Sequence, residues 1–193
     1  MRQAVVASPL PGRTSMIHRA ALASILLLVA APSLADDPST GPLIEGYGPT
    51  YPINDRDVPL PEDFSYKAVF DLAVYPGEVT AVNVHLESVA RFLNMHVRNG
   101  VPPEKMDLAV VVHGAAVKNL LSNDAYEARY KVDNPNLELL MLLHGAGVST
   151  YVCGQSMSFG GVDKDELADG VQVALSAMTM LTVLQSEDYA LLP

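Results

Sequence analysis

The chain has 193 residues, of which 49% are hydrophobic and 18% are charged, and this composition allows one sizeable globular core but not two. Its 22 acidic residues outnumber its 12 lysines and arginines, which gives a net charge of −10 at pH 7. Phosphate backbones and anionic membranes are bound through clustered Lys and Arg, and no basic run exists here, so the sequence argues against nucleic acid and membrane partners.

The segment 1–35 has the pattern of a secretory signal peptide. A positively charged flank ending at Arg19 precedes an apolar run over 20–31, and the small residues Ser33 and Ala35 follow at the −3 and −1 positions. The run of about 12 residues is well short of the roughly 20 that a helix needs to cross a bilayer. We predict cleavage near Ala35 and a periplasmic or secreted chain that is free of the membrane. The alternative is a buried N-terminal helix.

Removal of this segment makes the chain more acidic. Three of the 12 basic residues and none of the 22 acidic ones lie within 1–35, which leaves nine against 22 and a net charge of −13. The start of translation is open between Met1 and Met16, because the residues before Met16 add nothing that a signal needs.

Residues 36–64 are rich in Pro, Gly and Asp. Proline removes backbone donors and forbids helix, so this segment is predicted to form an irregular arm. Its larger apolar side chains suggest that the arm lies against the domain that follows: Tyr47, Tyr51, Ile53 and Phe64.

Residues 65–193 form the predicted domain, in which strand and helix patterns alternate. Strands are predicted over 68–74, 106–112, 148–153, 171–175 and 189–192. Helices are predicted over 79–97, 115–121, 124–131, 134–143 and 177–184, and a capping box at Asp163 and Glu166 opens a further short one. The run over 106–112 is almost wholly apolar, as in a central parallel strand. The alternation predicts a three-layer α/β/α fold around a mostly parallel sheet of about five strands, with flavodoxin-like layering.

Particular positions in these helices carry further predictions. Glu87 and Arg91 are four residues apart and are expected on the solvent face. Asn134 suits a helix cap and Pro135 the first turn. The helix that follows is apolar nearly all round as far as Leu143, so it needs cover on more than one side, which a subunit interface would provide.

The single cysteine, Cys153, closes a predicted strand. It cannot form a disulfide within the chain. Ligands of open α/β sheets gather at the carboxyl ends of strands, where unpaired N–H groups and a helix dipole favour a nucleophilic thiolate. Gly154 lets the backbone approach a ligand closely, and Ser156 is placed to donate a hydrogen bond to sulfur. The alternative is a small buried hydrophobe at the end of a core strand.

His113 and Gly114 close the preceding predicted strand. If the two strands are neighbours, His113 and Cys153 line one crevice, where the imidazole can promote a thiolate and Gly114 again allows close backbone approach. The alternative is a histidine satisfied by backbone groups.

Three further histidines and the absence of several motifs limit the functions that the chain can have. His144 is explained as a dipole partner at a helix C-terminus. His85 and His96 share a helix face without further ligands, so no metal site is expected. Dinucleotide, P-loop, C-x-x-C and nucleophile-elbow motifs are missing from the sequence, so we expect no nucleotide cofactor, no self-contained dithiol and no such hydrolase.

Four segments in order resemble DsrE/DsrF-like proteins: 112–117, 134–137, 152–156 and 174–191. The resemblance implies a three-layer α/β/α domain that assembles into homo-trimers or homo-hexamers. For the members that act in sulfur transfer it also implies a cysteine that carries a persulfide, a role that passes here to Cys153 alone. The sulfur-relay members act in the cytoplasm, whereas this chain has an export signal, so its donor and acceptor must differ from theirs.

Three hypotheses follow. The first is an exported persulfide carrier that accepts sulfane sulfur at Cys153 and passes it on, with donor and acceptor proteins or small sulfane-sulfur compounds as partners. The second is a non-catalytic, oligomeric binding or assembly module with a buried Cys153. The third is a redox or metal-handling protein in which Cys153 works with His113 or with a partner's thiol.

Overall fold

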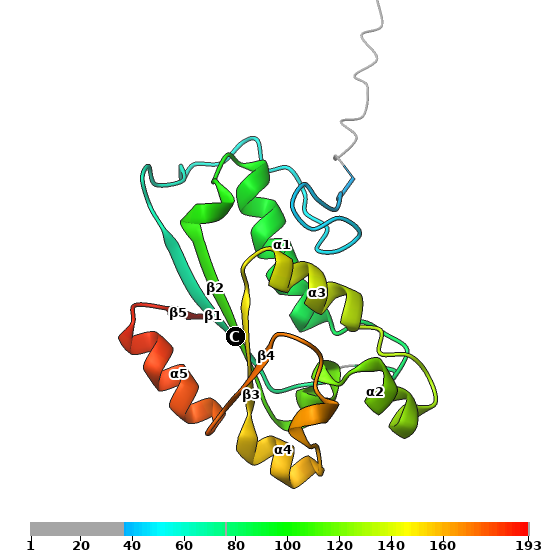
Figure 1. The fold of residues 1–193 in the computed structure, drawn as a ribbon. Coiled ribbons are helices and arrows are strands. Elements are labelled where there is room, and N and C mark those ends of the chain that lie inside the picture. Colours follow the sequence, from blue (N-terminus) through cyan, green and yellow to red (C-terminus); the bar gives the residue numbers. More distant parts are fainter. Residues whose placement is uncertain (1–36, 76, 193) are drawn as a thin grey trace, which may run out of the picture. The chain divides into compact units, whose positions relative to one another are not determined.

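The fold is built on a five-stranded sheet in which all strands run parallel. The computed structural model describes residues 37–75 and 77–192, so the predicted signal peptide over 1–35 lies outside the described residues. The strands are ordered β4-β3-β2-β1-β5 across the sheet (Figure 1). Their bounds are β1 Tyr66–Leu72, β2 Met106–Val112, β3 Ser149–Cys153, β4 Val171–Ala174 and β5 Ala190–Leu192. The predicted fold class is confirmed.

β2 lies at the centre because it is apolar on both faces. Residues 108–112 are each no more than 1% exposed, and the register places Val112 between Leu72 of β1 and Val152 of β3. A strand covered on both faces loses the alternation of polar and apolar residues, which is why its position could be predicted. β5 has only three residues and forms the predicted edge beside β1.

Helices cover both faces of the sheet and so complete three layers. α1 (Val84–Arg98) and α3 (Leu137–Gly145) pack on one face, and α5 (Ala177–Ser186) packs on the other (Figure 1). The other elements are α2 (Asn123–Tyr130), α4 (Gly154–Gly160) and the 3-10 helices η1 (Pro103–Lys105), η2 (Gly114–Leu120) and η3 (Lys164–Glu166). None of the helices within the described residues combines the length and the apolar character needed to cross a membrane.

Three helical segments differ from the prediction. α1 begins at Val84 instead of residue 79, because the Asn83 side chain caps it by accepting from the His85 N–H at 2.9 Å. The segment predicted as a helix over 115–121 is the 3-10 helix η2. α4 follows β3 directly, where only a short turn was expected, because one buried residue in a seven-residue helix leaves no periodicity to detect.

Asn134 joins two loops and does not cap α3. Its amide donates to the carbonyls of Asn119 and Leu121 at 2.9 and 2.6 Å, and its Oδ1 accepts from the Asn136 N–H at 2.9 Å. α3 therefore begins at Leu137, beyond the predicted cap. The expected capping box of Asp163 and Glu166 is confirmed and opens η3.

Two charged residues of α1 hold the arm. Glu87 accepts from the Gly48 N–H at 3.1 Å, and the Arg91 Nε donates to the Pro49 carbonyl at 3.2 Å. The prediction that Glu87 and Arg91 lie on the solvent face is therefore wrong. The arm covers this face of the helix, and sequence spacing within the helix could not reveal that.

One aliphatic residue anchors the arm in the core. Ile44 is 1% exposed and packs in the main core cluster, with Tyr47 at its margin. The other three side chains expected to lie against the domain are more than half exposed: Tyr51, Ile53 and Phe64. The Phe64 ring nevertheless packs edge-on against Tyr66 of β1, with ring centroids 4.9 Å apart, so the expectation is confirmed for Tyr47 and Phe64 and is wrong for Tyr51 and Ile53.

α3 is covered on one side only. Leu139, Leu140 and Leu143 are buried, whereas Met141 is 66% exposed and Leu142 is 36% exposed. A single copy of the chain therefore leaves uncovered the second face for which the sequence predicted a partner.

Candidate functional site

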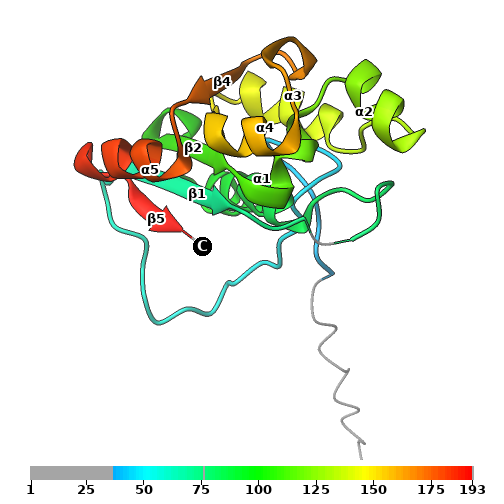
Figure 2. The same ribbon diagram turned by 90° about the horizontal axis from the view of Figure 1, so that it is seen from below.

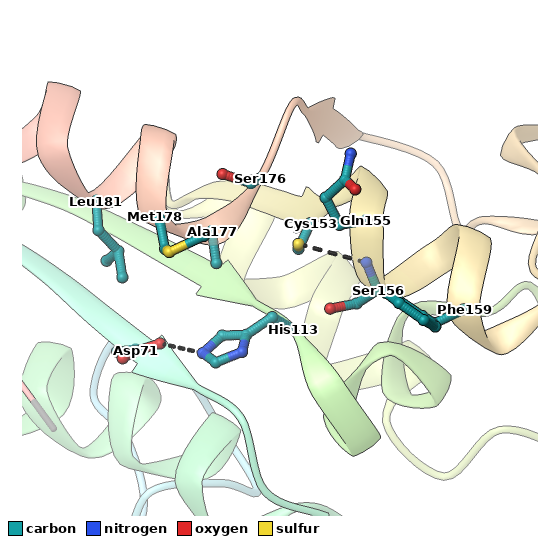
Figure 3. A pocket seen from close by; sticks show the side chains of 10 residues that line it. All are labelled: Asp71, His113, Cys153, Gln155, Ser156, Phe159, Ser176, Ala177, Met178 and Leu181. Carbon is teal, nitrogen blue, oxygen red and sulfur yellow. Dashed lines mark hydrogen bonds and ion pairs between the residues drawn. The ribbon is translucent and has the colours of Figure 1, made fainter.

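A cavity of about 440 Å³ opens at the carboxyl edge of the sheet. Three neighbouring strands supply Asp71 from β1, His113 from the end of β2 and Cys153 from β3 (Figure 3). The predicted neighbourhood of His113 and Cys153 is realised, because β2 pairs directly with β3. Ligands of parallel sheets bind at this edge. The other lining residues come from α4 and from the N-terminal half of α5 and include Ser156, Phe159, Ala177, Met178 and Leu181.

The sulfur of Cys153 lies where two helices begin. Cys153 is the N-cap of α4, and its Sγ accepts a hydrogen bond from the Ser156 N–H at 3.4 Å. α5 begins beside α4, with Ala177 as its first residue (Figure 2). Burial raises the pKa of the Cys153 thiol, but hydrogen bonds from Ser156 and from the N–H groups of Ala177 and Gln155 outweigh it, so the pKa lies below its usual value.

Cys153 is only 5% exposed, yet it lines the cavity. A thiol in this position is largely screened from solvent by α4 and α5 and borders the cavity. It is neither a surface cysteine nor one that is enclosed on every side by aliphatic groups.

His113 binds a carboxylate that the sequence analysis did not identify. Its Nε2 lies 2.8 Å from Asp71 Oδ1, and both side chains are about one third exposed, at 30% and 32%. An ionised carboxylate only accepts, so Nε2 carries a proton in this hydrogen bond. The alternative of backbone satisfaction is wrong for His113. Among the described contacts, no hydrogen bond joins its ring to Cys153.

Asp71 carried a weak signal in the sequence. Alternate residues of β1 face the α5 layer, where Val69 is fully buried and Asp71, two positions on, is half-buried beside the cavity. A carboxylate at the apolar end of a central strand was therefore a candidate site residue. We read it only as part of the strand.

Ser156 and Gly114 tie the loops after β2 and β3 together. The Gly114 N–H donates to Ser156 Oγ at 3.0 Å, which leaves the hydroxyl proton free for the sulfur. Gly114 has φ +55°, a conformation that favours glycine. The close approach that Gly154 permits is to the Ala174 carbonyl, which a Cβ at position 154 would meet at 2.9 Å.

The other three histidines within the described residues lie away from this cavity. His96 stacks on Phe92 with ring centroids 4.0 Å apart, and burial lowers its pKa. His85 lies on the exposed side of α1. His144 is in the last turn of α3, as predicted. Within residues 37–75 and 77–192, no three His, Cys, Asp or Glu side chains group as metal ligands.

The chain is a parallel α/β domain whose one thiol lies beside the N-termini of two helices, at the carboxyl edge of the sheet. This position is typical of a nucleophilic cysteine. The model of the DsrE/DsrF-like family matches residues 67–193, more than half of the chain. The chain therefore belongs to the DsrE/DsrF-like family, which suggests a function of the sulfur-relay type with sulfur-relay partners.

Two solved structures resemble the chain at low identity. The protein of unknown function MTH1491 from Methanobacterium thermoautotrophicum is 21% identical with a TM-score of 0.48, over 66% of this chain and 98% of that one. The ychN protein from E. coli is 16% identical with a TM-score of 0.47, over 65% and 96% of the two chains. No curated protein matches the chain.

Proposed function

We propose that the protein is an exported persulfide carrier that accepts sulfane sulfur at Cys153 and passes it to an acceptor thiol. The observation that carries this proposal is the position of Sγ between the N-termini of α4 and α5, where N–H groups lower the thiol pKa beside an open cavity. A thiolate that can be reached by its substrate is all that sulfur transfer requires of the protein.

The transfer is a displacement at sulfur. The Cys153 thiolate attacks the outer sulfur of a donor R–S–SH, the donor S–S bond breaks, and the electron pair leaves with R–S⁻. The transferred sulfur keeps its proton, and the product is Cys153–S–SH. An acceptor thiolate then attacks the outer sulfur and releases the Cys153 thiolate unchanged, with no net oxidation of the protein.

Mass spectrometry tests this proposal. Mature protein recovered from the periplasm or medium, reduced and then treated with benzyl persulfide, C₆H₅CH₂–S–SH, should gain about 32 Da in its native state, and Cys153→Ser should gain nothing. The same spectra give the mass of the mature chain and so test cleavage near Ala35. A wild type that gains sulfur only in denaturant would contradict the carrier and support the binding module with a buried thiol.

We also propose that several copies assemble through α3, as a homo-trimer or homo-hexamer. The exposed Met141 and Leu142 on this helix support the proposal. Met141→Glu should shift sedimentation towards a smaller species, because it places a charge in the contact, whereas Thr182→Glu on α5 should not. A wild type that sediments as a monomer would contradict the assembly.

A further inference from the structure

The cavity beside Cys153 has an apolar rim that is open to solvent. Phe159 on α4 is 94% exposed and Met178 on α5 is 79% exposed, and both line the cavity together with Leu181 (Figure 3). Apolar surface that is removed from water lowers the free energy of the complex, so a ligand that covers these side chains binds more tightly. The rim therefore favours a donor that brings an apolar group.

The charges around the cavity are unfavourable for an anion. Its one carboxylate, Asp71, is about one third exposed, and no lysine or arginine is among the described residues that line it. His113 already donates to Asp71, and the N–H groups at the two helix termini already point at Cys153 Sγ. The mature chain is also strongly acidic, with nine basic residues against 22 acidic ones. An anionic donor would meet repulsion from Asp71 without a compensating cationic side chain among the lining residues.

We infer that the site takes its sulfur from small organic donors whose carbon group is apolar and uncharged, and that it discriminates against anionic donors such as thiosulfate. This inference rests on the proposed carrier function and names the substrate class of the same site. The volume of about 440 Å³ suits a small molecule of this kind. Phe159 and Met178 hold the carbon group R of R–S–SH, and Asp71 repels negative charge.

Three methanethiosulfonates test the inference, because they share one leaving group and differ only in the group delivered. The Cys153 thiolate attacks the sulfur that is bonded to R in CH₃SO₂–S–R. The S–S bond breaks, CH₃SO₂⁻ leaves with the electron pair, and Cys153–S–S–R forms. The probes carry benzyl, 2-sulfonatoethyl and 2-(trimethylammonio)ethyl groups. Each rate with the native protein is divided by the rate of the same reagent with 2-mercaptoethanol, which removes intrinsic reactivity.

We expect the normalised benzyl rate to be the highest and to exceed the sulfonatoethyl rate by at least about tenfold. The double variant Phe159→Ser, Met178→Ser should reduce the benzyl rate several-fold. The matched control Leu175→Ser, at a side chain that is 72% exposed and outside the lining, should not. Asp71→Asn should raise the ratio of the sulfonatoethyl rate to the benzyl rate.

The outcomes distinguish failure of the proposed donor specificity from failure of the proposed carrier function. Equal normalised rates, or a faster sulfonatoethyl reaction, overturn the specificity while the carrier stands. A trimethylammonioethyl rate above the benzyl rate means that charge alone selects, which also overturns it. If no reagent modifies the native protein, the thiol is closed and the carrier proposal fails as well.

Discussion

Asn94→Ala is expected to lower the free energy of unfolding by about 2–4 kcal/mol. Asn94 is fully buried on α1, and its Oδ1 accepts from the N–H groups of Leu43 and Ile44 at 3.1 and 2.8 Å. Its amide donates to the carbonyls of Ile44, Tyr47 and Gly48 at 3.0, 2.9 and 3.3 Å. Alanine leaves these backbone groups buried without partners, and each unpaired group costs about 1–3 kcal/mol.

Urea unfolding measures the loss, with Met95→Ala as the control. Met95 is the next residue of α1 and is 41% exposed, so the control changes the helix without touching the arm and should lose less than about 0.5 kcal/mol. The arm of Asn94→Ala should also become sensitive to proteases, because its backbone is then free to open. Equal losses in the two variants would mean that Asn94 does not anchor the arm.

The sequence alone predicted the parallel sheet and the position of the thiol at the carboxyl end of a strand. An almost wholly apolar run that ends in three valines is typical of a strand with both faces covered, and this placed β2 at the centre. The alternation of strands and helices made the strands parallel, and parallel strands put the residues after β2 and β3 at one edge. The juxtaposition of His113 and Cys153 depended on the two strands being neighbours, an order that the sequence left open and that the pairing of β2 with β3 shows.

The features that sequence reasoning missed depend on contacts between distant segments. Asp71 becomes a site residue only because the end of β2 brings His113 within 2.8 Å of it, 42 residues later in the chain. Glu87 and Arg91 face the arm, whose path no periodicity describes. α4 is too short to show an apolar stripe, although it supplies the helix terminus that contacts the sulfur. Local sequence patterns indicate which residues are buried, but they do not show which distant residues will contact them.

Ser156→Ala is expected to slow the reaction of Cys153 with a neutral alkylating reagent by about three- to tenfold at neutral pH. Hydrogen bonds from Ser156 favour the thiolate and lower the thiol pKa against the effect of burial. Loss of the hydroxyl raises the pKa, so the variant holds less thiolate below it and its rate–pH curve moves to higher pH. The more basic thiolate is intrinsically more nucleophilic, which offsets part of the loss.

Rates of iodoacetamide reaction across pH measure this shift, with two controls. Ser156→Thr keeps the hydroxyl and should keep the curve. Ser158→Ala removes a hydroxyl of the same helix that donates to the Gly154 carbonyl, at 3.0 Å, and should not move the curve. A curve for Ser156→Ala that coincides with the wild type would mean that backbone N–H groups alone hold the thiolate.

The lowered pKa of the Cys153 thiol also makes the free energy of unfolding depend on pH. The folded thiol loses its proton at lower pH than the unfolded thiol, whose pKa is about 8.5, so between the two values the unfolded chain binds more protons. The free energy of unfolding contributed by Cys153 therefore rises with pH from the folded pKa upwards, is complete above about pH 8.5, and is lost as the pH falls through the folded pKa. Cys153→Ser should flatten the unfolding free energy across this interval in urea titrations at several pH values. A slope that survives in Cys153→Ser would assign the pH dependence to another group and weaken the case for a thiolate at this site.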